Sequence, residues 1–312
     1  MNTFKFTTLI LLTTFLMGSS FSVGKIGLAY SSPLLLAALR FTLAGIIMAV
    51  IVIALKRPHP SSRGNWIRML IIGALQTAGV MGCIFLSLRT ITASESSILT
   101  FTNPLLVVIL GTVFLRIRYR LYQWIGVLLG LAGVSITMGA QVEFKIGILF
   151  GILSAVFWAS STLLVKKWGA LFDTWVLSAY QMLFGGLLLF VCSFTLEKSN
   201  FILNGYSLSI LLWLSIMSSI VQFAVWYYLL QKRDPGKTSA YLFLAPFFGV
   251  LTGWLLLDDP LYPSIIVGGL FIIIGIYLVN NNSQKKKLRK SQKSIGKICF
   301  YWRRKKVYDG GN

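Results

Sequence analysis

The sequence predicts an all-α integral membrane protein with ten transmembrane helices. We expect these helices to form two inverted five-helix repeats, with both the N- and C-termini in the cytoplasm. The 312 residues are 56% apolar and only 12% charged, whereas a soluble domain is about half apolar and about a quarter charged. Surface of this composition is typical of a chain that folds in lipid. Two further patterns, the placement of the basic residues and an internal repeat, specify the arrangement.

Apolar runs of about 20 residues recur along the chain, and each is long enough to cross a hydrocarbon core of ~30 Å at ~1.5 Å per residue. The first run could pass for a signal peptide, but its counterpart in the repeat is internal, which favours a retained helix. The short loops leave no room for a soluble domain. The predicted spans are Phe6–Val23, Pro33–Leu55, Trp66–Leu88, Ala93–Leu115, Leu121–Met138, Ile146–Val165, Thr174–Thr195, Tyr206–Leu230, Thr238–Leu257 and Pro263–Val279.

The basic residues predict the orientation, because cytoplasmic loops of membrane proteins are enriched in Lys and Arg. With a cytoplasmic N-terminus, 24 of the 29 Lys and Arg residues lie inside, four lie in outside loops, and Arg40 lies within the second span. The net charge of +21 therefore mainly records topology, and we expect no nucleic-acid partner. Residues 281–312 form a basic cytoplasmic tail, either a solvated topogenic run or a segment attracted to anionic lipid.

The chain repeats itself at a nearly constant offset. A shift of 141 residues aligns the first and second spans with the sixth and seventh, so that Arg40 meets Gln181. A shift of 142 aligns the fourth and fifth with the ninth and tenth. We infer repeats over residues 1–140 and 144–280. Because each holds five spans, the second copy enters the membrane from the opposite side, which is typical of alternating-access carriers with a substrate site between the halves.

Four local patterns resemble the EamA-type permeases of the drug/metabolite transporter superfamily, and the resemblance covers about residues 5–280. They lie at the end of the first span, in the second, in the fourth and in the ninth. The residues are Gly18–Phe21, Pro33 with Ala37–Phe41, Ala93-Ser94 with Asn103-Pro104, and Ala245–Leu257. The resemblance implies a secondary transporter that moves a small metabolite, amino acid or drug-like solute, commonly outward.

The sequence also departs from this family. Arg116-Ile117 stands where the family commonly has a Gly-Glu pair, and only the second repeat keeps acids, at Asp258-Asp259. Met17 stands where an aromatic residue is common, whereas Trp158 keeps the aromatic in the second repeat.

Polar residues at membrane depth are costly and tend to be functional. Arg40 is predicted either to bind a carboxylate or another anion or to form a structural contact. Glu95 is a candidate for coupling or simply a residue that favours a helix N-terminus, and Pro104 and Pro246 are hinges or packing kinks. The other candidates for lining a substrate site are Gln76, Asn103, Trp158, Tyr180, Gln181, Gln222, Trp226 and Tyr227.

Several function classes lack their residues. His59 is the only histidine, Cys83, Cys192 and Cys299 are isolated, and the chain has no phosphate-binding Gly-x-x-x-x-Gly-Lys loop. We therefore expect no metal, no cofactor and no enzyme activity. The expected partners are a small-molecule substrate and the lipid bilayer of a bacterial cytoplasmic membrane, with the protein a monomer or a homodimer. The alternatives are an integral-membrane enzyme and a non-transporting membrane partner that uses the basic tail.

Overall fold

The computed structural model describes residues 3–116, 120–137, 145–232 and 244–280. In these ranges the secondary structure is helical, apart from one isolated antiparallel bridge between Ser31 and Phe201. The helices of the first half are α1 (Thr3–Gly27), α2 (Pro33–Ala54), α3 (Arg63–Gly73), η1 (Ala74–Gly79), α4 (Val80–Ser87), α5 (Ala93–Thr100), α6 (Asn103–Leu115) and α7 (Leu121–Thr137). Those of the second half are α8 (Ile146–Trp168), η2 (Gly169–Leu171), α9 (Thr174–Leu196), α10 (Gly205–Leu212), η3 (Trp213–Val221), α11 (Gln222–Lys232), α13 (Leu244–Leu257) and α14 (Pro263–Asn280).

Seven helical segments in the described ranges are long and apolar enough to cross a membrane. Shorter apolar helices occupy the other three predicted ranges, at Leu121–Gly133, Leu244–Leu257 and Pro263–Gly275. The multi-pass, all-helical character of the chain is therefore confirmed. The full count of ten spans and the cytoplasmic termini stay predictions, and the tail at residues 281–312 lies outside the described residues.

Local sequence signals set where several helices begin. Pro33 stands at the first position of α2, where its missing N–H costs nothing. The Thr92 and Glu95 side chains form a capping box at the start of α5, and Asn204 and Ser207 do the same for α10. Asp173 accepts hydrogen bonds from two backbone N–H groups at the start of α9. These side chains satisfy donors that a helix leaves unpaired at its N-terminus.

Three predicted spans are interrupted within the membrane. The fourth is divided into α5 and α6 at Phe101 and Thr102, directly before Pro104. The third and eighth contain π-helical turns, η1 and η3. Both π segments end at equivalent positions, Gly79 and Val221, which an offset of 142 residues relates. A π turn inserts a residue into the helical ladder, and such insertions frequently occur at functional sites.

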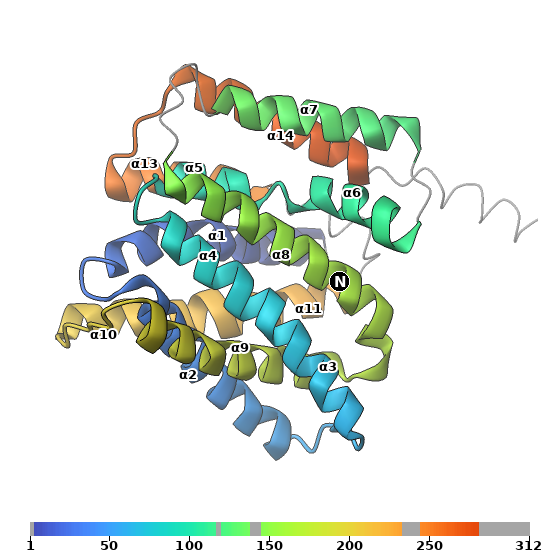
Figure 1. Cartoon of the computed structure of the whole chain (residues 1–312), viewed down its shortest axis with the longest axis vertical. Coiled ribbons are helices and arrows are strands. Elements are labelled where there is room, and N and C mark those ends of the chain that lie inside the picture. Colours follow the sequence, from blue (N-terminus) through green and yellow to red (C-terminus); the bar gives the residue numbers. More distant parts are fainter. Residues whose placement is uncertain (1–2, 117–119, 138–144, 233–243, 281–312) are drawn as a thin grey trace, which may run out of the picture.

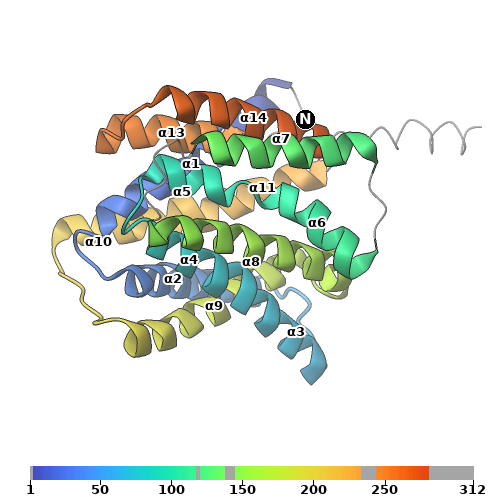
Figure 2. The same ribbon diagram turned by 45° about the horizontal axis from the view of Figure 1, so that its top comes forward.

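Two helix pairs connect the first half of the chain to the second. Helices α2 and α9 pack along each other, as do α7 and α14, and Figures 1 and 2 place these pairs towards opposite edges of the bundle. Glycines permit the close approach. A Cβ added at Gly45 would lie 2.5 Å from the backbone nitrogen of Leu183, and one added at Gly186 would lie 2.5 Å from the backbone nitrogen of Thr42. Both contacts relate residues by the same offset of 141, so the crossing of α2 and α9 is symmetric.

The pair α7 and α14 repeats this symmetry. A Cβ at Gly133 would lie 2.6 Å from the Gly268 carbonyl oxygen, and one at Gly275 would lie 2.5 Å from that of Gly126. Here the residues are related by an offset of 142. Close backbone approach at small residues is a typical way in which membrane helices pack.

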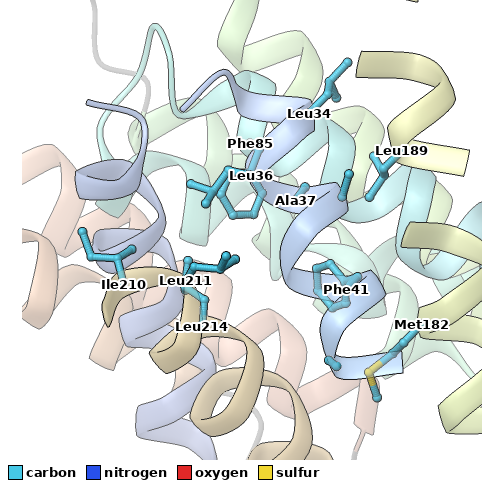
Figure 3. Close-up of a cluster of buried hydrophobic side chains, with 12 residues drawn as sticks. Leu34, Leu36, Ala37, Phe41, Phe85, Met182, Leu189, Ile210, Leu211 and Leu214 are labelled. Atoms are coloured by element: carbon cyan, nitrogen blue, oxygen red, sulfur yellow. The ribbon is translucent and has the colours of Figure 1, made fainter. Parts of the chain in front are cut away.

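A buried apolar cluster fills the space between α2, α4, α9, α10 and η3 (Figure 3). Phe41 of α2 and Phe85 of α4 are among its largest fully buried side chains. The outward surfaces are also apolar, with exposed residues such as Val50 and Phe194. A bundle that is apolar inside and outside is expected for helices in contact with lipid.

The loops at one end of the α2–α9 pair connect the two halves. Ser32 donates its backbone N–H to the Asn200 carbonyl at 2.9 Å, and Ile202 donates to the Tyr30 carbonyl at 2.7 Å. At the same end the Glu197 carboxylate accepts the backbone N–H of Leu35 at 2.9 Å. The opposite end of the pair has only the partly exposed ion pair between Arg57 and Asp173, at 3.8 Å.

Candidate functional site

A cavity of about 380 Å³ lies between helices of both repeats. This volume falls in the range of small-molecule sites. Residues of α1, α2, α8 and α9 line it, together with the two helices that contain π turns and Phe101 at the break between α5 and α6. The lining residues are Met17, Ser20, Phe21, Arg40, Gln76, Met81, Ile84, Phe85, Phe101, Trp158, Thr162, Val165, Gln181, Ser218, Gln222, Phe223 and Trp226.

Arg40 is the one cation among these lining residues, and its side chain is 3% exposed. Its Nε donates a hydrogen bond to Ser219 Oγ at 3.0 Å, and its Nη2 donates to the Ser218 carbonyl at 3.0 Å. The guanidinium carbon also lies 4.6 Å from the centroid of the Phe41 ring. Within the described residues Arg40 forms no ion pair. The cation is therefore held in position by neutral groups.

The π turns help to position this arginine and its surroundings. Ser218 and Ser219 belong to η3, where Ser219 Oγ donates to the Leu214 carbonyl five residues earlier. A π turn changes the register of the backbone hydrogen bonds, and in this segment the Ser218 carbonyl accepts from Arg40. Gln76 lies in η1 and also lines the cavity.

Three glutamines supply neutral polar groups to the cavity. Gln181 is 5% exposed and Gln222 is 4% exposed, while Gln76 is half-buried. In the part of the chain that the structure describes, none of the three side-chain amides has a hydrogen-bond partner from the protein. Buried amides normally find partners, so these groups are available to a bound solute or to water.

Aromatic rings form much of the remaining wall. The Phe21 and Phe101 ring centroids are 6.0 Å apart, and the Phe101 and Trp158 centroids are 5.5 Å apart. These separations lie within the range of favourable ring contacts. The three rings come from both repeats, since Phe21 is on α1 and Trp158 is on α8. Trp226 adds a further ring from α11.

The lining residues pair across the repeats. At the offsets of 141 and 142 residues, six positions of the first repeat that line the cavity correspond to six of the second that also line it. The cavity therefore contains the approximate two-fold axis that relates the repeats. The pairs are Met17 with Trp158, Phe21 with Thr162, Arg40 with Gln181, Gln76 with Ser218, Met81 with Phe223, and Ile84 with Trp226.

Five of the predicted binding residues come together at this cavity, namely Arg40, Gln76, Trp158, Gln181 and Gln222. Trp226, also considered for the pocket, lies there too. The structure does not bring Asn103 and Tyr180 to it. Asn103 is buried at the start of α6, and the break before it places Phe101 at the cavity instead. The side chain of Tyr227 lies outside the described residues.

Tyr180 faces away from the cavity because successive residues on a helix point about 100° apart. Its neighbour Gln181 lines the cavity, whereas the Tyr180 ring packs against Trp66 at 4.8 Å and against His59 at 5.6 Å between centroids. These residues form an aromatic cluster at the loop end of α3.

Glu95, the coupling candidate, does not line the cavity either. Its Oε2 accepts hydrogen bonds from the Thr92 backbone N–H at 2.8 Å and from Thr92 Oγ1 at 3.1 Å. This is the geometry of the capping interpretation. Of the two hinge candidates, Pro246 lines a separate apolar cavity beside α14, and the side chain of Pro104 lies outside the described residues.

A second polar contact joins the halves at the ends of α5 and α13. Asp259 is 5% exposed, and its Oδ2 accepts hydrogen bonds from the Ser94 backbone N–H at 3.1 Å and from Ser94 Oγ at 3.0 Å. Nearby, Lys25 Nζ donates to the Ile91 carbonyl at 2.6 Å. The carboxylate therefore caps a helix of the first repeat from the end of a helix of the second.

Sequence reasoning missed several apolar and small lining residues, including Met17, Phe21, Phe101 and Thr162. In an apolar chain such side chains cannot be separated from core or lipid-facing positions by periodicity. The repeat offset carries the missing signal for two of them, since Met17 is the equivalent of the predicted Trp158 and Phe21 is the equivalent of Thr162.

Comparison with known proteins places this architecture. The profile of the EamA-like transporter family matches twice, over residues 5–139 and 145–281. The uncharacterized transporter YvbV of Bacillus subtilis is 29% identical over 275 residues, which cover 86% of this chain and 90% of that protein. An uncharacterized transporter of Archaeoglobus fulgidus is 28% identical over 277 residues and is covered to 95%. A chloroplastic WAT1-related protein of Arabidopsis thaliana is 26% identical and is covered to 69%.

A solved crystal structure has the same fold, with a TM-score of 0.62 at 22% sequence identity. The match covers 87% of this chain and 95% of the other. The family profile accounts for both halves of the chain, and the relatives that cover most of its length are named as transporters. The protein is thus a multi-pass membrane transporter and belongs to the EamA-like transporter family.

Proposed function

We propose that this protein is a secondary transporter that carries a small metabolite, amino acid or drug-like solute out of the cell across a bacterial cytoplasmic membrane. The solute binds in the cavity between the repeats, and rocking of one repeat against the other exposes that cavity to each side in turn. The observation that carries this proposal is the set of six repeat-equivalent residue pairs around one cavity. A site on the two-fold axis keeps its lining when inverted halves exchange their roles.

The helix contacts support rocking about this site. The two glycine crossings, between α2 and α9 and between α7 and α14, are close and symmetric. Such contacts suit helices that move as units. The energy source is either a proton gradient or exchange of one solute for another, because the described lining contains no carboxylate that would bind a coupled proton.

Flux measurements in liposomes test the proposal. Purified protein is reconstituted and loaded with a panel of amino acids and small metabolites, and release is followed with and without a proton gradient. We expect release of at least one solute class that is absent from empty liposomes. Absence of flux for every solute, in preparations where the protein keeps its melting temperature, would contradict the carrier function.

A matched pair of variants ties the flux to the cavity. Ser20 lines the cavity and donates its hydroxyl to the Met17 carbonyl, whereas Ser209 is exposed on α10 and makes the equivalent bond to Tyr206. Ser20→Trp fills the cavity and should abolish flux. Ser209→Trp adds the same bulk elsewhere and should leave flux unchanged. Equal flux in the two variants would exclude this cavity as the route.

Removal of the basic tail separates a carrier from a non-transporting partner. The tail supplies eleven of the basic residues but lies beyond both matches to the family, and we propose that it contacts anionic lipid. Truncation after residue 283 should preserve flux in liposomes. A truncated protein that keeps its melting temperature but loses all transport would favour the tail as the functional element.

A further inference from the structure

We infer that the transported solute is an organic anion with an aromatic body, bound with its carboxylate or other oxyanion at Arg40. This inference rests on the proposed function, since it names the class of solute for the same cavity. It is carried by three properties of the described lining residues: the electrostatic state of Arg40, the absence of a compensating acid, and the composition of the opposite wall.

The Arg40 guanidinium retains donors for a ligand. A guanidinium has five N–H donors, and the protein uses two, the Nε–H to Ser219 Oγ and one Nη2–H to the Ser218 carbonyl. Both Nη1 donors and the second Nη2 donor have no protein partner within the described residues. At 3% exposure these donors are largely withdrawn from bulk water. A planar pair of free donors matches the two oxygens of a carboxylate.

The charge of Arg40 is also uncompensated. A buried cation is costly unless it is paired with an anion, yet its two hydrogen-bond partners are neutral. The residues that line the cavity in the described ranges include no Asp or Glu. The equivalent position in the second repeat is the neutral Gln181. The cavity therefore attracts anions and repels cations, and a bound anion would supply the missing countercharge.

The rest of the lining selects the body of the solute. Phe21, Phe101 and Trp158 form a continuous wall of rings, with centroid separations of 6.0 and 5.5 Å. Trp226 and Phe85 add further aromatic surface. Aromatic walls favour flat apolar groups through ring contacts. A volume of about 380 Å³ is at the lower end for ligand sites, which favours a solute with a single or a fused ring.

A series of probes with one body and three charges tests this inference. Purified protein in detergent is titrated with phenylacetate, phenylacetamide and benzylamine, and with acetate as a probe that lacks the ring. Binding is read from the melting temperature and from tryptophan fluorescence, because Trp158 and Trp226 line the cavity. We expect phenylacetate to bind at least about tenfold more tightly than the other three. Equal or tighter binding of benzylamine, or no binding of phenylacetate at millimolar concentration, would overturn the inference.

Variants locate the binding. Arg40→Gln should abolish the preference for phenylacetate, but it also removes the contacts to η3 and so risks the fold. Gln181→Glu avoids this risk, because it is isosteric, keeps Arg40 and its bonds, and adds the missing acid to the cavity. Gln181→Glu should weaken phenylacetate binding by about tenfold or more and strengthen benzylamine binding. Gln123→Glu on α7 makes the same change away from the cavity and should bind phenylacetate as the unaltered protein does.

Failure of this inference can be told apart from failure of the transport function. Binding in detergent requires no transport, and flux in liposomes requires no particular charge. Tight phenylacetate binding that is lost in Gln181→Glu supports the anion site even if no solute crosses the membrane. Flux of cationic solutes, together with phenylacetate binding that Gln181→Glu leaves unchanged, overturns the anion site while the transporter stands.

Discussion

The two repeats share their backbone contacts but differ in the side chains that they present. Gly45 and Gly186 make equivalent close contacts, and both halves place a π segment beside the cavity. The lining chemistry is different, because the first repeat supplies Arg40 where the second supplies Gln181. The comparison teaches that the duplicated backbone provides the architecture of a carrier, while sequence divergence at a few equivalent positions provides its chemical selectivity.

The symmetric glycine crossing should be the most sensitive feature to break. Gly45→Val and Gly186→Val each place a side chain where the opposite backbone lies 2.5 Å from the Cβ position. Overpacking of this kind costs typically about 1–3 kcal/mol, and more against a rigid backbone. We expect both variants to lose stability to a similar degree in thermal unfolding in detergent.

Gly269→Val provides the control for this crossing, because no atom lies within 4 Å of a Cβ added there. Its melting temperature should stay near that of the unaltered protein. A large loss for only one of the two crossing glycines would show that the helix contacts are less symmetric than their geometry indicates.

The acid pair of the second repeat offers a contact that the first repeat lacks. Asp259→Asn removes the charge that accepts both hydrogen bonds from Ser94 and should lower the free energy of unfolding by about 1–2 kcal/mol. Asp258→Asn changes the exposed neighbour and should shift it by less than about 0.5 kcal/mol. Chemical denaturation of the two variants measures the difference, and equal losses would refute a specific role for Asp259.

An exchange of residues between the repeats tests the equivalence of the two sides of the cavity. We expect Arg40→Gln to lose about tenfold in phenylacetate affinity. In the double variant with Gln181→Arg the new arginine faces the same cavity, with Gln76 and Thr77 at the positions equivalent to Ser218 and Ser219. The double variant should recover part of the affinity in the same titration. No recovery in a folded double variant would show that the site depends on the first repeat alone.

The smallest predicted effect concerns a backbone feature common to both halves. Arg116 and Asp258, which an offset of 142 relates, adopt positive φ values of 51° and 52°. Glycine enters this left-handed region without the usual steric cost. Arg116→Gly and Asp258→Gly should therefore each stabilise the protein by about 0.5–1 kcal/mol, seen as a higher melting temperature. Arg89→Gly, at a residue without positive φ, should lower it slightly; a rise there would remove the backbone explanation.

The sequence predicted the helices well because the signals for a helix in lipid are one-dimensional. Long apolar runs, Pro33 at a helix start and the Thr92 cap are all local. The interruptions were not predicted, since a π turn depends on contacts from other helices such as that of Arg40 with Ser218. Equivalences such as Gly45 with Gly186 were found because duplication leaves a constant offset.

The cavity was predictable only where polarity marks it. Arg40, Gln76, Gln181 and Gln222 stand out because such side chains are rare in apolar helices. Tyr180 was assigned to the site wrongly, because a helix that is apolar on all sides does not reveal which face turns inward. For the same reason the apolar wall, including Phe101, could not be separated from ordinary packing.

The π segments also carry information about the history of the chain. A π turn contains one residue more than the α-helical turn that it replaces. The two segments end at Gly79 and Val221, equivalent positions of the two repeats. A single insertion in an ancestral five-helix unit, before that unit was duplicated, accounts for both, whereas a later origin requires the same event twice. The distorted helix is then older than the two-repeat protein, and Arg40, which only one copy carries, records a change made after the halves were joined.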